Sequence, residues 1–307
     1  MMDAFVQQRI EEWLSGPYDE DSKKTIRTLQ KTNPEALIDA FYTDLSFGTA
    51  GLRGIMGVGT NRMNVYTVQK ATQGLANYLL KQQKNPSVVI GYDCRNNSLL
   101  FAEKTAEVLA GNGIKVFLYK DMRPVPYVSF GVRNLHATAG VMITASHNPA
   151  EYNGYKVFWS DGAQVVPPHD QGIIEDVRAI TSLSQIRHAP ESPLIERLEI
   201  DAAYLKALRA LQYQAADNQA YGKLLKITYT PLHGTGMTLV PKALLEWGFS
   251  NVNCVAKQMV PDGNFPTVKF PNPEYKEALQ LGIDQLQETQ SDVLLATDPD
   301  ADRMGVV

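Results

Sequence analysis

Three aspartates at alternating positions close to the end of the printed sequence give the strongest indication of chemistry. Asp298, Asp300 and Asp302 stand in the segment Asp-Pro-Asp-Ala-Asp-Arg, directly after the apolar run 293–297. On an extended loop, alternate side chains point to the same side. Three carboxylates gathered in this way repel one another unless a cation lies between them. Because oxygen ligands suit Mg²⁺ or Ca²⁺ better than Zn²⁺, we expect a site for a divalent cation here.

An EF-hand calcium loop and a solvated acidic turn are the alternatives for this segment. The EF-hand fits poorly, because Pro299 and Arg303 replace the usual spacers and a strand, not a helix, precedes the loop. The solvated turn is disfavoured, because the apolar strand places the loop at the carboxyl edge of a sheet, where α/β folds bind ligands. Arg303 could steady the carboxylates or bind a phosphate.

A second candidate is Ser146, in the segment Thr-Ala-Ser-His-Asn-Pro after the apolar run 139–143. Pro149 interrupts regular structure, so we expect Ser146 on an exposed turn at the carboxyl end of a strand. His147 could carry a proton or bind phosphate beside a serine nucleophile. An ordinary turn is the alternative, since Ser, Asn and Pro are common turn residues. The segment is not the Gly-x-Ser-x-Gly elbow of α/β-hydrolases.

Two further segments carry basic residues that could contact a phosphate. We expect the glycine-rich segment 47–59 to be a loop whose backbone can approach a ligand, with Arg53 as a bidentate donor. It is not a P-loop, because no Gly-Lys-Ser/Thr follows. Lys156 could carry a proton if burial and nearby charge lowered its pKa, although a lone lysine is more often solvated. His169 and His233 are weaker candidates.

Strands and helices alternate along the chain, and their order predicts how these residues are positioned. Compact apolar runs predict strands at 87–92, 115–119, 139–143, 225–230 and 292–297, with helical spacing between most of them. This alternation predicts an α/β fold of two tandem domains, each a mostly parallel sheet covered by helices. We expect the boundary near residue 198, with the serine in domain 1–198 and the aspartates in domain 199–307.

The composition is that of a folded protein and argues against several classes. The 307 residues are 44% hydrophobic and 20% charged, with a net charge of −4, which disfavours disorder and a nucleic-acid partner. Cys94 and Cys254 form neither a disulfide framework nor a zinc knuckle. The first residues resemble neither a signal peptide nor a membrane span. We therefore expect a cytoplasmic protein with no membrane partner.

Taken together, these segments resemble the α-D-phosphohexomutase family, which includes phosphoglucomutase, phosphomannomutase and phosphopentomutase. The Ser146 segment resembles the family's phosphoserine loop, and Asp298 to Arg303 resembles its magnesium loop, in the family's order and each at a strand end. With residues 48–53 the combination is specific, and the resemblance extends over nearly the whole chain from about Tyr42. The segments closest to the longer phosphoglucomutase and phosphopentomutase branch are 47–54, 153–158 and 271–273.

The resemblance implies that a phosphoryl group moves between two hydroxyls of a sugar phosphate, through a phosphoserine and a sugar bisphosphate intermediate. Ser146 would be the phosphorylated residue. One Mg²⁺ would be bound by a phosphoserine oxygen and by Asp298, Asp300 and Asp302, and a sugar 1,6-bisphosphate would act as activator. The other implied site residues are His147, Lys156 (the favoured proton carrier) and Arg53 in the cleft, with Thr49, Arg53, Asn148 and Arg303 binding substrate or phosphate.

Members of the family have four domains, and the resemblance covers roughly the first two. Because residues 304–307 read as the start of a strand where the sequence stops, we expect a truncated chain without domains III and IV. Such a chain would keep the phosphoserine and metal site but lack full mutase turnover, and glucose, mannose and pentose phosphates all stay open as substrates. A Mg-dependent phosphatase, which would leave Ser146 without a role, and a non-catalytic sugar-phosphate-binding module are the alternatives.

Overall fold

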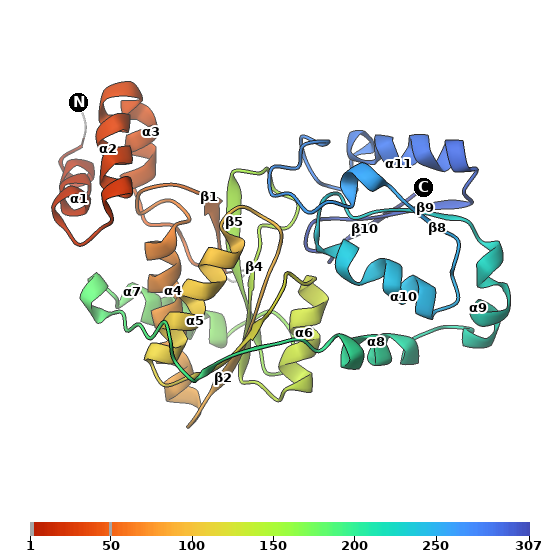
Figure 1. Cartoon of the computed structure of the whole chain (residues 1–307). Coiled ribbons are helices and arrows are strands. Elements are labelled where there is room, and N and C mark those ends of the chain that lie inside the picture. Colours follow the sequence, from red (N-terminus) through yellow and green to blue (C-terminus); the bar gives the residue numbers. More distant parts are fainter. Residues whose placement is uncertain (1–2, 49–50) are drawn as a thin grey trace.

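The computed structural model describes residues 3–48 and 51–307, and it contains two separate sheets (Figure 1). Six described strands form the first sheet in the order β1-β5-β4-β2-β3-β6. Their bounds are Leu52–Ile55 (β1), Ser87–Tyr92 (β2), Lys115–Tyr119 (β3), Ala139–Ile143 (β4), Tyr152–Trp159 (β5) and Ile195–Leu198 (β6). Strands β2, β3, β4 and β6 are parallel, whereas β5 runs antiparallel to both β4 and β1.

Helices cover both faces of this sheet, as Figure 1 shows. One face carries α4 (Val65–Gln82), α5 (Ser98–Gly111) and α7 (His169–Arg178); the other carries α6 (Val125–Asn134) and α8 (Asp201–Ala210). Alternation along β2 explains how both faces become apolar, since Val88 and Ile90 pack with the first group of helices and Val89 with the second. All three side chains are fully buried, as expected of a parallel strand covered on both sides.

Three helices before the first sheet form a small bundle of their own (Figure 1). They are α1 (Ala4–Ser15), α2 (Glu20–Thr32) and α3 (Pro34–Phe41). Asn33 ends α2 and also caps α3, accepting a hydrogen bond from the Ala36 N–H, while Pro34 occupies the first turn. Apolar spacing along α1 buries Val6, Ile10 and Trp13 against the other two helices.

The second domain has a smaller sheet of described strands in the order β10-β9-β7-β8. Their bounds are Ile227–Thr230 (β7), Val252–Cys254 (β8), Val293–Thr297 (β9) and Met304–Val306 (β10). Strands β7, β8 and β9 are parallel, and β10 is antiparallel to β9 at the edge. The helices of this part are α9 (Ala215–Tyr221), α10 (Val240–Glu246) and α11 (Lys276–Thr289), of which α11 contacts β7 and β9.

The predicted α/β fold with two sheets is confirmed, and the strands predicted at 87–92, 115–119 and 139–143 are β2, β3 and β4. The prediction of a loop over the whole of 47–59 was wrong, because β1 lies inside that segment. Glycine does not favour strands, so the sequence there gives no strand pattern, and β1 is stabilised by its pairing with β5. The boundary that we propose near residue 198 falls between β6 and α8. Among the described residues, no helix is both long and apolar enough to cross a membrane.

Candidate active site

The Ser146 side chain lies where the two domains meet, at the carboxyl end of β4. Its Oγ donates a hydrogen bond to Asp298 Oδ2 at 2.7 Å and lies 3.1 Å from His147 Nδ1. The expected turn is present, but the expectation of an exposed serine was wrong, since only 3% of the residue is accessible. The loop after β9 of the second domain contacts the serine, and sequence spacing within one domain could not show this contact.

The three aspartates follow β9 in a tight turn, not the extended loop that we expected. The Ala301 N–H donates to the Asp298 carbonyl at 2.9 Å, and Ala301 adopts a positive φ of 52°. The predicted clustering is nevertheless present, because each carboxylate offers an oxygen within 4.8 Å of the other two. Asp298 and Asp300 are buried and Asp302 is exposed.

Lys156, on β5, supplies the positive charge among these carboxylates. Its Nζ donates to Asp300 Oδ2 at 2.9 Å and to Asp302 Oδ2 at 3.0 Å. Burial acts to lower the pKa of Lys156, but Asp300 and then Asp302 outweigh burial and raise it. A lowered pKa was the condition under which we expected Lys156 to carry a proton; that condition is not met, and Lys156 is held as an ammonium ion.

The remaining charges of the cluster respond to the same neighbours. Burial, followed by Asp300, raises the pKa of Asp298 above the ordinary aspartate value. Burial would also raise the pKa of Asp300, but Lys156 outweighs it and the pKa is lowered. Burial, followed by Arg303 and Arg53, lowers the pKa of His147, which favours the neutral imidazole beside Ser146.

The donor set fits a hard divalent cation. All three ligand candidates are carboxylates, and one oxygen of each lies within 4.8 Å of the others after β9. Asp300 Oδ1 is buried and finds no hydrogen-bond partner among the described residues, which leaves one strong acceptor free for a cation. The carboxylates Asp298, Asp300 and Asp302 could thus hold Mg²⁺ close to the Ser146 hydroxyl.

The predicted phosphate-binding residues are only partly gathered. Arg53, on β1, donates from Nη1 to Asn148 Oδ1 at 3.2 Å, which joins the glycine-rich segment to the serine loop. The backbone N–H of Arg303 donates to Asp298 Oδ1 at 3.1 Å, whereas its exposed side chain pairs with Glu274. Thr49 lies outside the described residues.

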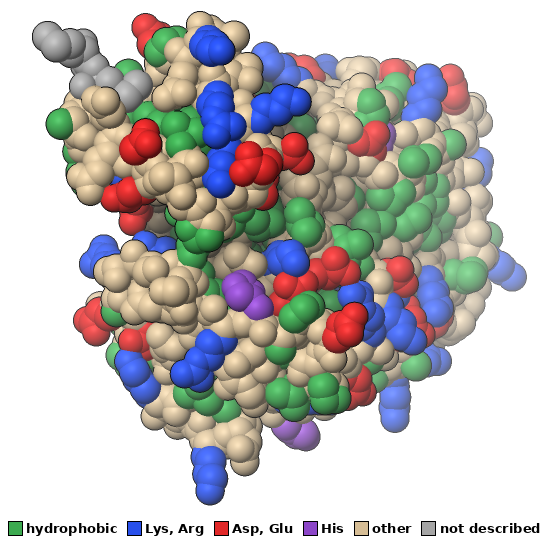
Figure 2. Space-filling model, turned by 60° about the vertical axis from the view of Figure 1, so that its left-hand side comes forward, with side chains coloured by type: hydrophobic (Ala, Val, Ile, Leu, Met, Phe, Trp, Pro, Cys, Tyr) green, Lys and Arg blue, Asp and Glu red, His purple; other side chains and the backbone are tan. Residues whose placement is uncertain are grey.

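Acidic, basic and histidine side chains gather around a hollow in the face shown in Figure 2.

The two weaker histidine candidates have other roles. His169 stacks on Trp159, with ring centroids 3.9 Å apart, and His233 is bonded to the Val260 carbonyl and to Thr267. Both are therefore packing residues, as is usual for lone histidines.

Sequence reasoning missed three polar residues that support the serine loop. Thr144 Oγ1 accepts from the Ser146 N–H at 2.9 Å and donates to Asp300 Oδ2 at 3.0 Å, so it ties the two loops together. Asp93 and Arg95, directly after β2, are both buried. Asp93 and Arg95 could have been predicted to lie near the site, because they are two opposite charges directly after an apolar strand. The end of that strand lies at the same sheet edge as Ser146.

Comparison with known proteins agrees with this arrangement. Residues 44–184 match phosphoglucomutase/phosphomannomutase alpha/beta/alpha domain I, and residues 202–307 match alpha/beta/alpha domain II of the same group. The chain belongs to the phosphoglucomutase/phosphomannomutase family. Domains I and II of the family are therefore present, and each contributes one loop of the candidate site.

Members of the phosphoglucomutase/phosphomannomutase family resemble the chain over most of its length. A phosphoglucomutase of Staphylococcus haemolyticus is 40% identical, over 87% of this chain and 49% of its own length. A probable phosphoribomutase of Schizosaccharomyces pombe is 38% identical, over 98% of this chain and 53% of its own length. The chain thus spans about half the length of the curated relatives it matches.

A solved structure shares the fold. The putative phosphomannomutase of Thermus thermophilus superimposes with a TM-score of 0.74 and 29% identity. The match covers 86% of this chain and 57% of that protein. The two-sheet arrangement described above is therefore the one found in a crystallised member of the family.

Proposed function

We propose that the protein moves a phosphoryl group between two hydroxyls of a sugar phosphate, with Ser146 as the group that carries it. One observation carries the proposal: the Ser146 Oγ hydrogen-bonds to Asp298, a member of a three-carboxylate cluster fitted to a cation. The matched relatives named phosphoglucomutase and phosphoribomutase support a sugar phosphate as substrate. Their names differ in the sugar, so the substrate class is a hexose or pentose phosphate.

Phosphorylated Ser146 would give its phosphoryl group to the free hydroxyl of the bound sugar phosphate. The bond from phosphorus to the serine oxygen breaks, the bond from phosphorus to the sugar oxygen forms, and a sugar bisphosphate results. The proton released by the sugar hydroxyl replaces the phosphoryl group on Ser146, so no proton is gained or lost. The second phosphoryl group of the bisphosphate then returns to Ser146, leaving the isomeric sugar phosphate.

Lys156 is the group to which we assign this proton transfer. Asp300 and Asp302 hold it as an ammonium ion, so it carries a proton that it can give to the departing serine oxygen. Neutral Lys156 would then readily accept the sugar's proton, because the same two carboxylates favour its charged form. Arg53 and Asn148, joined beside the serine, are placed to bind a phosphate of the substrate.

A Mg²⁺ ion held by Asp298, Asp300 and Asp302 would supply positive charge that stabilises the charge on the moving phosphoryl group. The chain's own contribution is to remove water from this region, since Ser146, Asp298 and Asp300 are all buried. Charges in such a dry site interact more strongly than they would in water.

Intact-mass measurement after incubation with Mg²⁺ and glucose 1,6-bisphosphate tests the proposal. We expect one phosphoryl group on the peptide that contains Ser146, and none on a Ser146→Ala variant. Ser129→Ala, which removes the half-buried hydroxyl of a serine outside the site, is the control and should still take up phosphate. Binding of the sugar bisphosphate without covalent phosphate would favour a binding module, and rapid release of phosphate from many phosphoesters would favour a phosphatase.

A further inference from the structure

The guanidinium group of Arg95 lies directly behind the serine loop and is buried. Its Nη1 donates to the carbonyl oxygens of Pro149 and Tyr152, at 2.8 and 3.0 Å. Its Nη2 donates to the carbonyl oxygens of Ser146, at 2.6 Å, and Asn148. One side chain therefore binds four carbonyl groups, which begin at the nucleophile and continue through the loop that follows it.

The backbone at Ser146 needs such support. Its φ is 53°, in the left-handed region that residues other than glycine rarely adopt. Strained conformations of this kind persist only where the surrounding contacts determine them, and they occur often at functional sites. Arg95 holds the carbonyl of Ser146, and Thr144 Oγ1 holds its N–H at 2.9 Å. Both peptide groups of the serine are thus fixed, and its Oγ is directed to Asp298.

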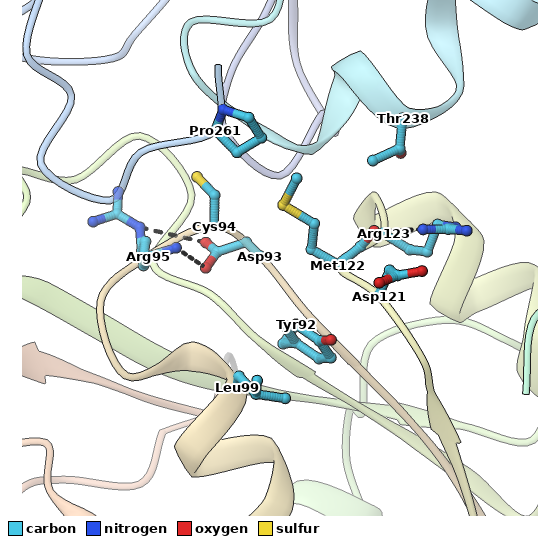
Figure 3. A pocket seen from close by; sticks show the side chains of 10 residues that line it. All are labelled: Tyr92, Asp93, Cys94, Arg95, Leu99, Asp121, Met122, Arg123, Thr238 and Pro261. Atoms are coloured by element: carbon cyan, nitrogen blue, oxygen red, sulfur yellow. Dashed lines mark hydrogen bonds and ion pairs between the residues drawn. The ribbon is translucent and has the colours of Figure 1, made fainter. Parts of the chain in front are cut away.

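Arg95 is itself held from the side opposite the serine loop. Asp93 Oδ2 lies 3.4 Å from Arg95 Nε, and Asp93 Oδ1 accepts from the Arg95 N–H at 2.9 Å and from Ser98 Oγ at 2.6 Å. Figure 3 shows this carboxylate facing Arg95, with Pro261 and Thr238 of the second domain across the pocket. The Asp93 and Arg95 side chains are both fully buried, so the pair is out of contact with water.

The second domain packs against the same arginine. The Phe265 ring lies 4.9 Å from Arg95 Cζ, within the range of a cation–π contact. Asn96 Nδ2 donates to Asn264 Oδ1 at 2.9 Å, so the segment before Phe265 is bonded to the turn that carries Arg95. Gly263 allows this approach, because a Cβ atom there would lie 2.4 Å from the Asn96 nitrogen.

We propose that Arg95 is a positioning residue for phosphoryl transfer at Ser146: it holds the strained serine loop in the orientation that presents Oγ to the carboxylate cluster. This inference rests on the proposed function. An arginine suits the task because its planar group offers five donors in fixed directions, whereas a lysine offers three on a flexible stem. Arg95 is not a catalytic residue, since among the described residues its side-chain hydrogen bonds are all to backbone carbonyls and none is to a reacting atom.

Two substitutions in the 307-residue chain test the role, with a matched control. Arg95→Met keeps the apolar stem and removes all donors, and Arg95→Lys keeps the charge and provides the same test if the first variant does not fold. Arg62→Met is the control, because the Arg62 side chain is only 12% exposed and also bonds a carboxylate and carbonyl groups, those of Asp39 and Asn61, which lie outside the serine loop. Hydrogen exchange of residues 144–152 and the rate of phosphate uptake from glucose 1,6-bisphosphate are the two measurements.

We expect exchange at 144–152 to accelerate at least about tenfold in the Arg95 variants while residues 87–92 stay protected. Phosphate uptake at Ser146 should slow about 10- to 100-fold, as is typical when an outer-shell partner is lost. The half-saturating concentration of the bisphosphate should change little, because Arg95 does not touch the substrate. Arg62→Met should leave both the loop's exchange and the uptake rate close to those of the wild type.

Unchanged uptake in the Arg95 variants, with or without faster exchange, would overturn the positioning role. Equal slowing in Arg62→Met would overturn it too, because the effect would then follow from the loss of any mostly buried arginine. Absence of phosphate on Ser146 in the wild-type chain would overturn the proposed function, and with it this role. That failure is distinguishable, because the exchange of residues 144–152 would still report whether Arg95 holds the loop.

Discussion

At the scale of single residues, the site consists of charges that folding has removed from water. A buried carboxylate is tolerated only when it is paired and hydrogen-bonded. Asp300 meets this condition through Lys156 and Thr144, whereas Asp302 keeps contact with solvent while sharing the same lysine. The two aspartates therefore have the same chemistry but should differ in their effect on stability.

Asn substitutions at these two positions test that difference. Asp300→Asn removes the buried partner of Lys156, and loss of one member of a buried ion pair typically costs about 3–5 kcal/mol of unfolding free energy. Asp302→Asn should cost about 1 kcal/mol or less, as is usual for exposed pairs. Urea unfolding with a chelator present measures both changes. Equal losses in the two variants would contradict the assignment of Asp300 as the buried anchor of the cluster.

At the scale of elements, β5 is the strand that assembles the site. It lies between β1, which carries Arg53, and β4, which leads into the serine loop, and it carries Lys156 itself. Gly154 is paired with Arg53 and also lies beside the Thr144 carbonyl. Here the three strands approach one another too closely for a side chain, so a Cβ atom at residue 154 would separate them.

Gly154→Ala is expected to destabilise the protein by about 1–3 kcal/mol through overpacking. The added Cβ would lie 2.5 Å from the Thr144 oxygen and 2.9 Å from the Leu52 oxygen, both of them backbone atoms that cannot easily move. Gly113→Ala is the control, because Gly113 has a positive φ of 79° but no atom near its Cβ position. It should show only conformational strain, about 1 kcal/mol.

Thermal unfolding of the two glycine variants gives the comparison. If the Gly113 variant lost as much stability as the Gly154 variant, strain alone would account for the result. Such a result would contradict the prediction that a side chain at residue 154 destabilises the protein by forcing the three strands apart.

At the scale of the whole molecule, the site lies between two domains that are joined by hydrogen bonds at two places. The Val125 N–H donates to the Asp300 carbonyl at 2.8 Å, which ties the aspartate loop after β9 to the first domain. Arg123 makes a two-pronged hydrogen bond to Asp201, at 2.9 and 3.0 Å, and Tyr127 donates to the same carboxylate at 2.7 Å. Asp201 begins α8, so this group holds the connection between the two domains.

The Asp201 contacts predict a loss of stability in acid. Burial acts to raise the pKa of Asp201, but the hydrogen bonds from Arg123 and Tyr127 outweigh it and lower the pKa. A carboxylate with a lowered folded-state pKa stabilises the protein fully above its ordinary value, about 3.9. The stabilisation is lost as the pH falls through the lowered value. Because the group is partly exposed, it contributes about 1 kcal/mol or less.

Asp201→Asn should therefore be less stable than the wild type at pH 6, and the gap should narrow as the pH falls towards 3. Urea unfolding across this range measures the gap, with Asp21→Asn, at an exposed aspartate of α2, as the control for removing a carboxylate. A gap that stays constant over the whole range would contradict a stabilising Asp201 carboxylate.

The sequence by itself determined the α/β class, most strands and helices, and the residues with the strongest chemical character. Apolar periodicity is a local property, so β2, β3 and β4, and the positions of the loops at Ser146 and Asp298, could be predicted from it. Two loops that follow apolar strands could also be assigned to sheet edges, because parallel strands end at the same edge.

Only the tertiary structure decided how these loops act on one another. The contact of Ser146 with Asp298 joins residues of two domains, and β1 exists because a distant strand pairs with it. The charge state of Lys156 depends on two carboxylates far along the chain, and the role of Arg95 depends on carbonyl groups that no sequence pattern marks. Burial, pKa and backbone strain arise from neighbours in space, which is why spacing along the chain could not supply them.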